Sequence, residues 1–173
     1  TEVAAINPTQ MLAMAVEKGA DIDQLSKLMD LQERWENKQA HKDYVAAMSK
    51  FRRECPDIIK TKSGHKIMYA GLAESIGQIK DLLAECGLSH SWNTVQEGDV
   101  TTVTCVVTHI NGHSESTSLS AAPDTSGSKN SIQAIGSTVT YLQRYTMFSI
   151  LGLASTEGDT DGNYETPTAA LDE

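Results

Sequence analysis

The stretch LSHSWNTVQEGDVTTVTCVVTHINGHSESTSLSA, residues 88–121, decides the fold class. Residues 100–110 alternate regularly between inward and outward side-chain types, and residues 88–95 do so more loosely, which is typical of half-buried strands. The sequence EGD at 97–99 predicts a turn between them. The stretch therefore predicts the first two strands of an antiparallel meander.

The dipeptide Asn111-Gly112 is a strong hairpin signal. It predicts a two-residue type I′ turn that returns the chain through residues 114–121 as a third strand. His109 and His113 flank this turn. No cysteine or acid is placed to complete a metal site with them, so we interpret both as exposed hairpin residues and expect no metal centre.

Helical periodicity flanks the meander on both sides. An apolar stripe predicts a helix from Leu72 to Cys86, and the last helix is expected over about residues 131–151. Gly136 and Ser137 are expected to pack closely against the sheet. The face expected to cover the sheet carries these residues: Ile132, Ile135, Val139, Leu142, Thr146 and Ile150.

The N-terminal third predicts helices and a hairpin. Capping signals predict a short helix to about Lys18 and a second helix from Asp21 to about Arg53. The second helix has one sparse apolar stripe, so we expect it to pack on a neighbour or another subunit, with Trp35 as a packing anchor. Residues 58–69 predict a hairpin around a Ser63-Gly64 turn.

The element order predicts an α+β fold with an antiparallel sheet: a β-hairpin, a helix, a three-stranded meander and a helix, preceded by a helical extension. We divide the chain into an N-terminal helical extension at 1–53, a core domain at 54–155 and an acidic tail at 156–173. The tail is aperiodic and is expected to be disordered.

Composition narrows the functional classes. No apolar run is long enough to span a membrane, and the first residues show no secretory signal. Cys55, Cys86 and Cys105 form no CxxC pair and suit a reducing cytoplasm. No P-loop, Gly-x-Ser-x-Gly or Ser-His-Asp order is present, so we expect no cofactor, no ATP-driven activity and no catalytic residues.

Charge is unevenly distributed along the chain. The formal net charge is −9, but residues 38–66 hold eight Lys or Arg against three acids, and residues 157–173 hold six acids and no base. A basic segment with a net charge of +5 is therefore set in an acidic chain. Phosphate binding depends on local potential more than on the total, so the net charge does not exclude nucleic acid.

Two groups of residues are candidates for binding a nucleic acid. The expected hairpin combines cations with an aromatic ring, as single-strand binders do, and its alternative interpretation is an edge strand kept soluble by lysines. In the last helix Arg144 is the sole charged residue, with Tyr141 and Tyr145 beside it, and it could contact a phosphate. The alternative interpretation is that Arg144 forms a structural ion pair with Glu74 or Asp81. The candidates are Arg52, Arg53, Lys60, Lys62, His65, Lys66, Tyr69, Lys129, Tyr141, Arg144 and Tyr145.

The segment QAIGSTVTYLQRYTMFSILGLASTEGDTDGN, residues 133–163, resembles the signature of the Erf (essential recombination function) family of phage annealing proteins. That signature is a Gly-Ser-x-x-Thr-Tyr-x-x-Arg-Tyr helix with an apolar continuation and an Asp-rich tail. The matching residues are Gly136, Ser137, Thr140, Tyr141, Arg144, Tyr145, Leu151, Gly152, Asp159 and Asp161. Upstream, Lys60, Lys62, Lys66, Tyr69, Ala70, Leu72, Leu82, Leu83, Gly87 and Leu88 also match, so the resemblance spans about 44–163.

The resemblance implies an annealing-protein-like fold and a strand-annealing recombinase of phage or prophage origin. Such a protein anneals complementary single-stranded DNA without ATP, as a ring or filament of subunits in the host cytoplasm. Its partners would be single-stranded DNA, the annealed duplex intermediate and further copies of the chain. The host's single-strand-binding protein is a further candidate.

Three other functions stay open. The order α-β-β-β-α from 72 to 151 also matches a double-stranded-RNA-binding module, although only Lys129 stands where that module has a lysine cluster. A non-catalytic assembly scaffold would use the long helix and the acidic tail. A metal-dependent nuclease would require a carboxylate cluster on the core. Salt-dependent oligonucleotide binding, strand preference and divalent-dependent cleavage separate these possibilities.

Overall fold

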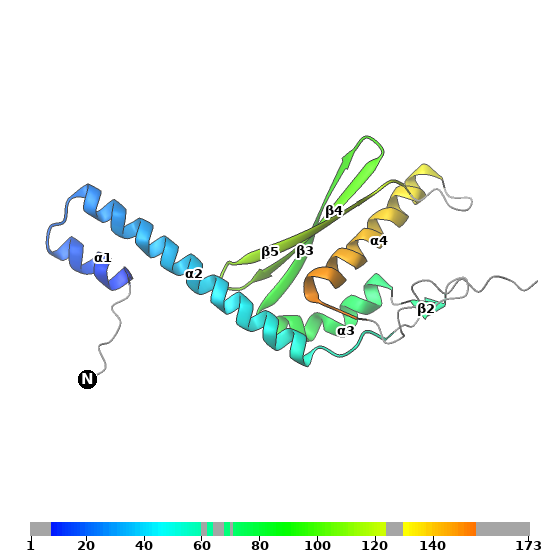
Figure 1. Ribbon diagram of the computed structural model, residues 1–173, viewed down its shortest axis with the longest axis horizontal. Coiled ribbons are helices and arrows are strands. Elements are labelled where there is room, and N and C mark those ends of the chain that lie inside the picture. The colour runs from blue at the N-terminus through cyan, green and yellow to red at the C-terminus, as the bar shows by residue number, and fades with distance from the viewer. Residues whose placement is uncertain (1–7, 60–61, 64–67, 70, 124–129, 155–173) are drawn as a thin grey trace, which may run out of the picture.

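The computed structural model describes residues 8–59, 62–63, 68–69, 71–123 and 130–154. It confirms the α+β class, with an N-terminal helical region and an antiparallel sheet (Figure 1). The elements are α1 (Pro8–Glu17), α2 (Ile22–Glu54), β1 (Lys62–Ser63), β2 (Met68–Tyr69), α3 (Leu72–Glu85), β3 (Leu88–Glu97), β4 (Val100–His109), β5 (Ser114–Ala121) and α4 (Ser131–Leu151). None of the described helices carries an apolar stretch long enough to cross a membrane.

The meander is a three-stranded sheet in the order β3-β4-β5. The connection between β4 and β5 differs from the predicted two-residue turn. The amide of His109 donates to the carbonyl of His113 at 2.9 Å, and the amide of Gly112 donates to the carbonyl of His109 at 2.8 Å, so three residues, 110–112, form the loop. Gly112 has a φ of +95°, a conformation that glycine adopts without strain. The sequence signal located the hairpin correctly, but the predicted turn type is wrong.

Three helices cover one face of the sheet (Figure 1). α4 packs on β4 and β5, α3 packs beside β3, and the last turns of α2 contact β4 and β3. Alternate side chains of β4 are buried beneath them, among them Val103, Cys105 and Val107, each fully buried. The indole Nε1 of Trp92 donates to the carbonyl of Gln143 at 3.2 Å, which ties β3 to α4.

The opposite face of the sheet carries hydroxyl groups. Thr102 and Ser120, Thr104 and Ser118, and Thr108 and Ser114 face each other across β4 and β5, with 2.8 Å between the oxygens of each pair. Cross-strand hydroxyl pairs stabilise a sheet modestly without any apolar burial. This face is therefore polar and uncovered by the described helices.

The buried stripe of α4 is displaced from the predicted one. Ala134, Thr138 and Leu142 are buried against the sheet, whereas Ile132 is 80% exposed. Gly136 is also exposed, and a Cβ built on it would meet nothing within 4 Å. The expectations that Ile132 covers the sheet and that Gly136 packs closely against it are wrong, because Ala134 and Thr138 occupy the buried line at this end of α4; Leu142 and Thr146 are buried as expected.

The β1–β2 hairpin also differs in register from its prediction. Lys62 pairs with Tyr69 and Ser63 with Met68, so the loop is longer than a Ser63-Gly64 turn would make it. The hairpin starts at fully buried Ile58, whose amide donates to the carbonyl of Ala154 at 3.2 Å. Its root therefore leaves the core beside the carboxyl end of α4.

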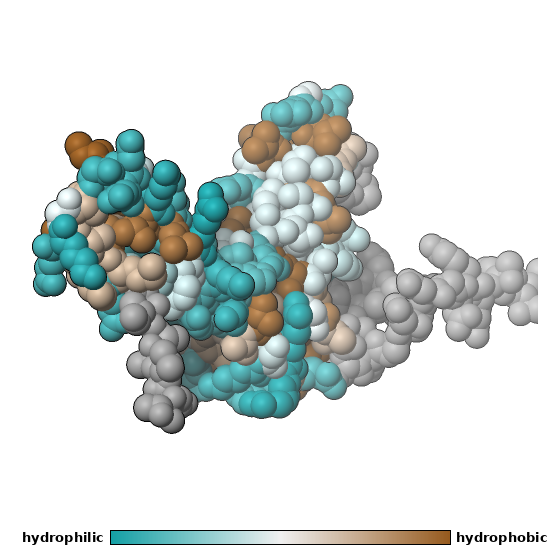
Figure 2. Space-filling model, turned by 60° about the vertical axis from the view of Figure 1, so that its left-hand side comes forward, coloured by the Kyte–Doolittle hydropathy of each residue, from teal (hydrophilic) through white to brown (hydrophobic). Residues whose placement is uncertain are grey.

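α2 begins at the N-cap Asp21, whose side chain accepts from the amide of Gln24. Its buried residues are Tyr44, Ala47, Met48 and Phe51, all near its end. We call α1 and residues 22–40 of α2 the arm. The arm projects from the core and exposes hydrophobic side chains among polar ones (Figures 1 and 2). Trp35, the expected packing anchor, is 43% exposed.

The predicted division at residues 53 and 155 stays a prediction. Residues 44–54 already contribute to the hydrophobic core, and the predicted tail at 156–173 lies outside the described residues. The two turn histidines are less exposed than predicted: His109 is 9% exposed and the His113 side chain 27%.

Candidate nucleic-acid interface

One exposed face of α4 collects the residues of the signature helix. Gly136, Ser137, Thr140, Tyr141 and Arg144 line a shallow open hollow of about 400 Å³. Residues three and four apart share a helix face, so this spacing places them in one line along α4. The line lies away from Ala134, Thr138 and Leu142, which the sheet covers. The sequence order therefore produces a continuous surface rather than a buried contact.

Two tyrosines and an arginine form the centre of this surface. The rings of Tyr141 and Tyr145 are 4.3 Å apart between centroids and tilted by 41°. The Cζ of Arg144 lies 5.0 Å from the Tyr145 ring centroid and 5.8 Å from that of Tyr141, within the range of a cation–π contact. Tyr141 is 53% exposed and Tyr145 42%. Two exposed rings and a half-buried arginine thus lie together on this face of α4.

The phenol of Tyr141 is held in its neutral form. Partial burial raises the pKa of Tyr141 above its ordinary value of 10.0, and Tyr145 raises it further through its charge and its hydrogen bond. The positive charge of Arg144 lowers this pKa and so opposes both effects. A neutral phenol neither repels a phosphate nor cancels the charge of the arginine beside it. The phenol therefore adds no negative charge beside Arg144 at physiological pH.

Small polar groups extend this surface toward the start of α4. The hydroxyl of Thr140 donates to the carbonyl of Gly136 at 2.9 Å. Gly136, Ser137 and Thr140 were not among the candidate site residues predicted from sequence. Helical spacing from Tyr141 and Arg144 would have placed them on the same face. Without a side chain at Gly136, the hollow is open at that end.

Arg52, a predicted DNA-binding residue, joins two helix ends. Its Nη2 donates to the carbonyl of Ile150 at 3.1 Å and its Nε to that of Leu151 at 3.4 Å. Cations stabilise the carboxyl end of a helix, where carbonyls lack intrahelical partners. Arg53 instead forms a 2.7 Å ion pair with Glu54, and its side chain is 73% exposed. Arg52 therefore contacts the end of α4, whereas Arg53 is an exposed side chain paired with its neighbour in sequence.

The structure locates the remaining candidates only in part. Lys62 and Tyr69 pair across the β1–β2 hairpin through their backbones. Lys60, His65, Lys66 and Lys129 lie outside the described residues. Their predicted role in DNA binding stays a prediction. The hairpin root is held by the side chain of Gln78 on α3, which exchanges hydrogen bonds with both backbone groups of Ile59.

Exposed aromatic rings beside cations are the surface that proteins binding single-stranded nucleic acids use, because every base has a face that can stack. Comparison with known proteins gives the family. The chain belongs to the ERF superfamily, whose family model matches residues 44–171. The resemblance stated from the sequence is therefore confirmed. Neither the curated proteins nor the solved structures compared with the chain gave a match.

Family membership sets the broad function. The ERF family is associated with phage recombination and the annealing of single-stranded DNA. The match begins at Tyr44, which is also the first buried residue of α2. The arm precedes the matched region and is a separate feature of this chain.

Proposed function

We propose that this protein binds single-stranded DNA and anneals complementary strands without ATP, acting as a homo-oligomer. The observation that carries the proposal is the pair of exposed rings, Tyr141 and Tyr145, with Arg144 beside them on α4, inside the region that matches the ERF superfamily. An arginine there can hold a phosphate or stack on a base, and the tyrosines provide stacking faces.

The mechanism follows from what such a surface leaves accessible. Bases that stack by their faces keep their Watson–Crick edges free, so a second strand can pair with them while the first stays bound. Cations on the backbone side reduce the repulsion between the two strands. The basic segment at 38–66 supplies such cations, and its hairpin leaves the core beside the end of α4. Pairing and stacking of complementary bases are themselves favourable, so annealing needs no energy from a nucleotide.

Assembly is part of the proposal because a chain of 173 residues covers only a few nucleotides by itself. A head-to-tail contact repeated between identical subunits gives a closed ring or a helical filament. The free edges of β3 and β5 and the exposed hydrophobic side chains of the arm are candidate contact surfaces. We place this activity in the cytoplasm of the bacterial host, with the host's single-strand-binding protein as a further candidate partner.

The test is an annealing assay with two complementary oligonucleotides in buffer without nucleotide. The wild-type protein should accelerate duplex formation, and Tyr141→Ala with Tyr145→Ala should lose most of that acceleration. Stacking is worth about 1–3 kcal/mol per base, so the double variant should also bind a single strand at least about tenfold more weakly. Ile132→Ala, an exposed substitution on the same helix, is the control. Wild-type protein that leaves the annealing rate unchanged would refute the proposal.

A second candidate function rests on topology. The order α3-β3-β4-β5-α4, with both helices on one face of the sheet, is also the arrangement expected of a double-stranded-RNA-binding module. Competition between single-stranded DNA and double-stranded RNA distinguishes the two functions. Preference for the RNA duplex would favour this alternative over annealing.

A further inference from the structure

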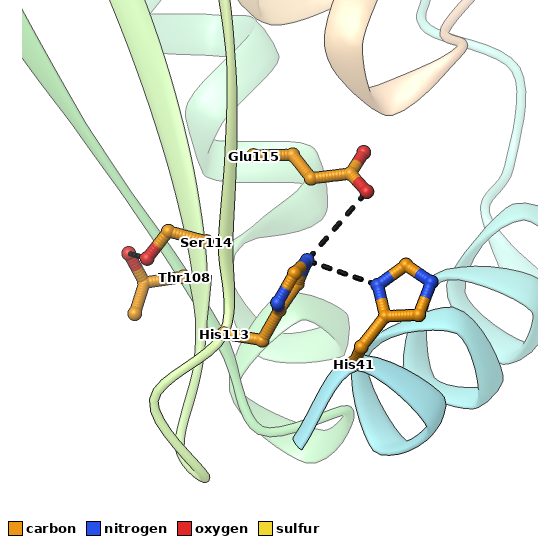
Figure 3. A network of polar contacts seen from close by, with 5 residues as sticks. All are labelled: His41, Thr108, His113, Ser114 and Glu115. Atoms are coloured by element: carbon orange, nitrogen blue, oxygen red, sulfur yellow. Dashed lines mark hydrogen bonds and ion pairs between the residues drawn. The ribbon is translucent and has the colours of Figure 1, made fainter. Parts of the chain in front are cut away.

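Three side chains of types that can bind a metal converge where α2 passes the loop between β4 and β5. One of them is Glu115, so an acid does lie beside a turn histidine, contrary to the expectation from the sequence. The Nδ1 of His41 lies 3.1 Å from the Nε2 of His113, and that Nε2 lies 3.7 Å from the Oε1 of Glu115. All three ligand atoms lie within 4.8 Å of one another. Figure 3 shows the two imidazoles and the carboxylate pointing toward a common point, with Thr108 and Ser114 on the other face of the strands.

Two of the three separations between these atoms are close to those of a tetrahedral ion, and the third, between His41 and Glu115, lies within 4.8 Å. Zinc binds histidine nitrogens and carboxylate oxygens at about 2.0–2.2 Å, so neighbouring ligands of a tetrahedral site are about 3.3–3.6 Å apart. The two short separations, 3.1 Å and 3.7 Å, lie on either side of this range. Two histidines and one glutamate also form a known three-ligand set for zinc, with water in the fourth position.

Local structure aligns the ligands before any ion binds. His113 and Glu115 are two residues apart in extended chain, so their side chains lie on the same face. The ring of Tyr44 contacts the His113 ring edge-on, with 5.1 Å between centroids. Asn111 donates to Asp43 at 2.7 Å and so joins the loop to α2 beside His41. The backbone of each ligand is therefore held near its partners.

We propose that His41, His113 and Glu115 bind a divalent transition-metal ion of the zinc class. Such a site takes imidazole and carboxylate ligands and leaves one position for water. A hollow of about 290 Å³, lined by residues that include Ala40, Gly112 and His113, lies beside the ligands and provides an entry path. The competing interpretation is a His41–His113 hydrogen bond with no ion.

The ion would fix the direction of the arm. Residues 22–43 of α2 bury no side chain, so few contacts determine how this part of the helix leaves the core. A metal bridge from His41 to the β4–β5 hairpin would join α2 to the sheet at the base of the arm. His41 precedes the region matched by the ERF family, and the site lies on different elements from the tyrosine pair of α4. The inference does not depend on the proposed function.

The experiment is a titration of the metal-free protein with Co²⁺ and Zn²⁺. We expect one ion per chain, a visible Co²⁺ absorption of tetrahedral type without thiolate charge-transfer bands, and a higher melting temperature with Zn²⁺. His41→Gln, His113→Gln and Glu115→Gln should each weaken binding by more than the roughly tenfold cost of losing an outer-shell partner. His90→Gln, at a half-buried histidine on β3, should bind like the wild type.

NMR spectra of the imidazole protons give a second readout. Of the five histidines, those of positions 41 and 113 should shift on Zn²⁺ addition, and circular dichroism should show that each variant is folded. Absence of Co²⁺ and Zn²⁺ binding, unchanged affinity in folded His113→Gln, or ligation by cysteine thiolates would overturn the proposal. DNA annealing is measured separately, so loss of the metal site and loss of the annealing function give different results.

Discussion

Arg144 combines a helix-face position with contacts to two aromatic rings. Arg144→Ala should weaken single-stranded DNA binding by about 1–3 kcal/mol, the scale of a lost charge-assisted hydrogen bond, with little change in melting temperature. Arg144→Lys should recover only part of the loss, because lysine lacks the planar guanidinium. Fluorescence anisotropy with a labelled oligonucleotide and a thermal melt check both effects.

The opposite result would assign Arg144 to the fold. A large loss of stability with normal DNA affinity in the folded variant would mean that the guanidinium is a structural partner, as the alternative pairing with Glu74 or Asp81 predicts.

Cys105 is fully buried on β4, and burial raises the pKa of its thiol from 9.0 to about 11. Above pH 9 the unfolded chain releases this proton while the folded chain keeps it. Stability is therefore complete below about pH 9 and is lost as the pH rises toward 11. Urea unfolding at several alkaline pH values should show the decline, and Cys105→Ala should reduce it. Tyr44, a buried tyrosine whose pKa is also raised, should account for part of the decline in stability that remains in Cys105→Ala. An identical decline in Cys105→Ala would contradict this assignment.

At the scale of elements, the ends of α2 and α4 are joined by Arg52. Its bonds to the carbonyls of Ile150 and Leu151 accompany a left-handed Gly152, with φ of +71°, that ends α4. Arg52→Ala should lower the free energy of unfolding by about 1–2 kcal/mol. Arg53→Ala should be nearly neutral, because an exposed ion pair contributes little. Denaturant unfolding of both variants tests this difference.

The same two variants test the predicted DNA contacts. If both arginines bind phosphate, each substitution should reduce affinity regardless of its effect on stability. An Arg52→Ala protein with lower stability and unchanged affinity would limit Arg52 to its structural contact.

The basic hairpin gives a prediction about salt. Charge reversal of Lys60 and Lys62 should weaken DNA binding and flatten its dependence on salt, by about 0.7 in logarithmic slope for each lost phosphate contact. Reversal of Lys27 on the arm together with Lys80 on α3 changes the total charge equally and is the control. Binding measured over a series of salt concentrations distinguishes a local contact from a general charge effect. Equal slopes for the hairpin variant and the wild type would remove the hairpin from the site.

At the scale of the whole molecule, the arm exposes large hydrophobic residues that the core does not cover. Met29 is 60% exposed, Leu31 45% and Trp35 43%. If the arm contacts a neighbouring subunit, Met29→Glu with Trp35→Glu should reduce the assembly to smaller species while the fold is retained. Light scattering with and without an oligonucleotide measures the mass against the 18.7 kDa chain. A wild-type mass of one chain under both conditions would contradict assembly.

Local sequence determined much of the architecture. The bounds of α4 and β5 agree with their predictions, because helical period and strand alternation are properties of neighbouring residues. The N-cap of α4, Asn130, whose side chain accepts from the amide of Gln133, is equally local. The helical spacing also placed Tyr141 and Arg144 on a face of α4 away from the sheet, while their predicted role in DNA binding stays a prediction. The family resemblance rests on that same segment and was confirmed.

Features of the fold that depend on packing between distant segments could not be predicted from the local sequence. Which line of α4 faces the sheet depends on the small residues Ala134 and Thr138 fitting against β4 and β5, so Ile132 and Gly136 were misplaced. The registers of the two hairpins differ from their predictions because local signals locate a turn more reliably than they fix its length.

The convergence of His41 with His113 was decided only by the tertiary structure. These residues are 72 positions apart, and no spacing in the sequence relates them. They meet because Tyr44, Met48 and Phe51 bury one side of α2 against the core, which sets the helix across the end of β4 and β5. The sequence by itself determined the elements and the family. The packing of those elements determined which side chains of distant segments share a site, because burial of apolar surface, rather than any local preference, fixes the angle at which α2 crosses the sheet.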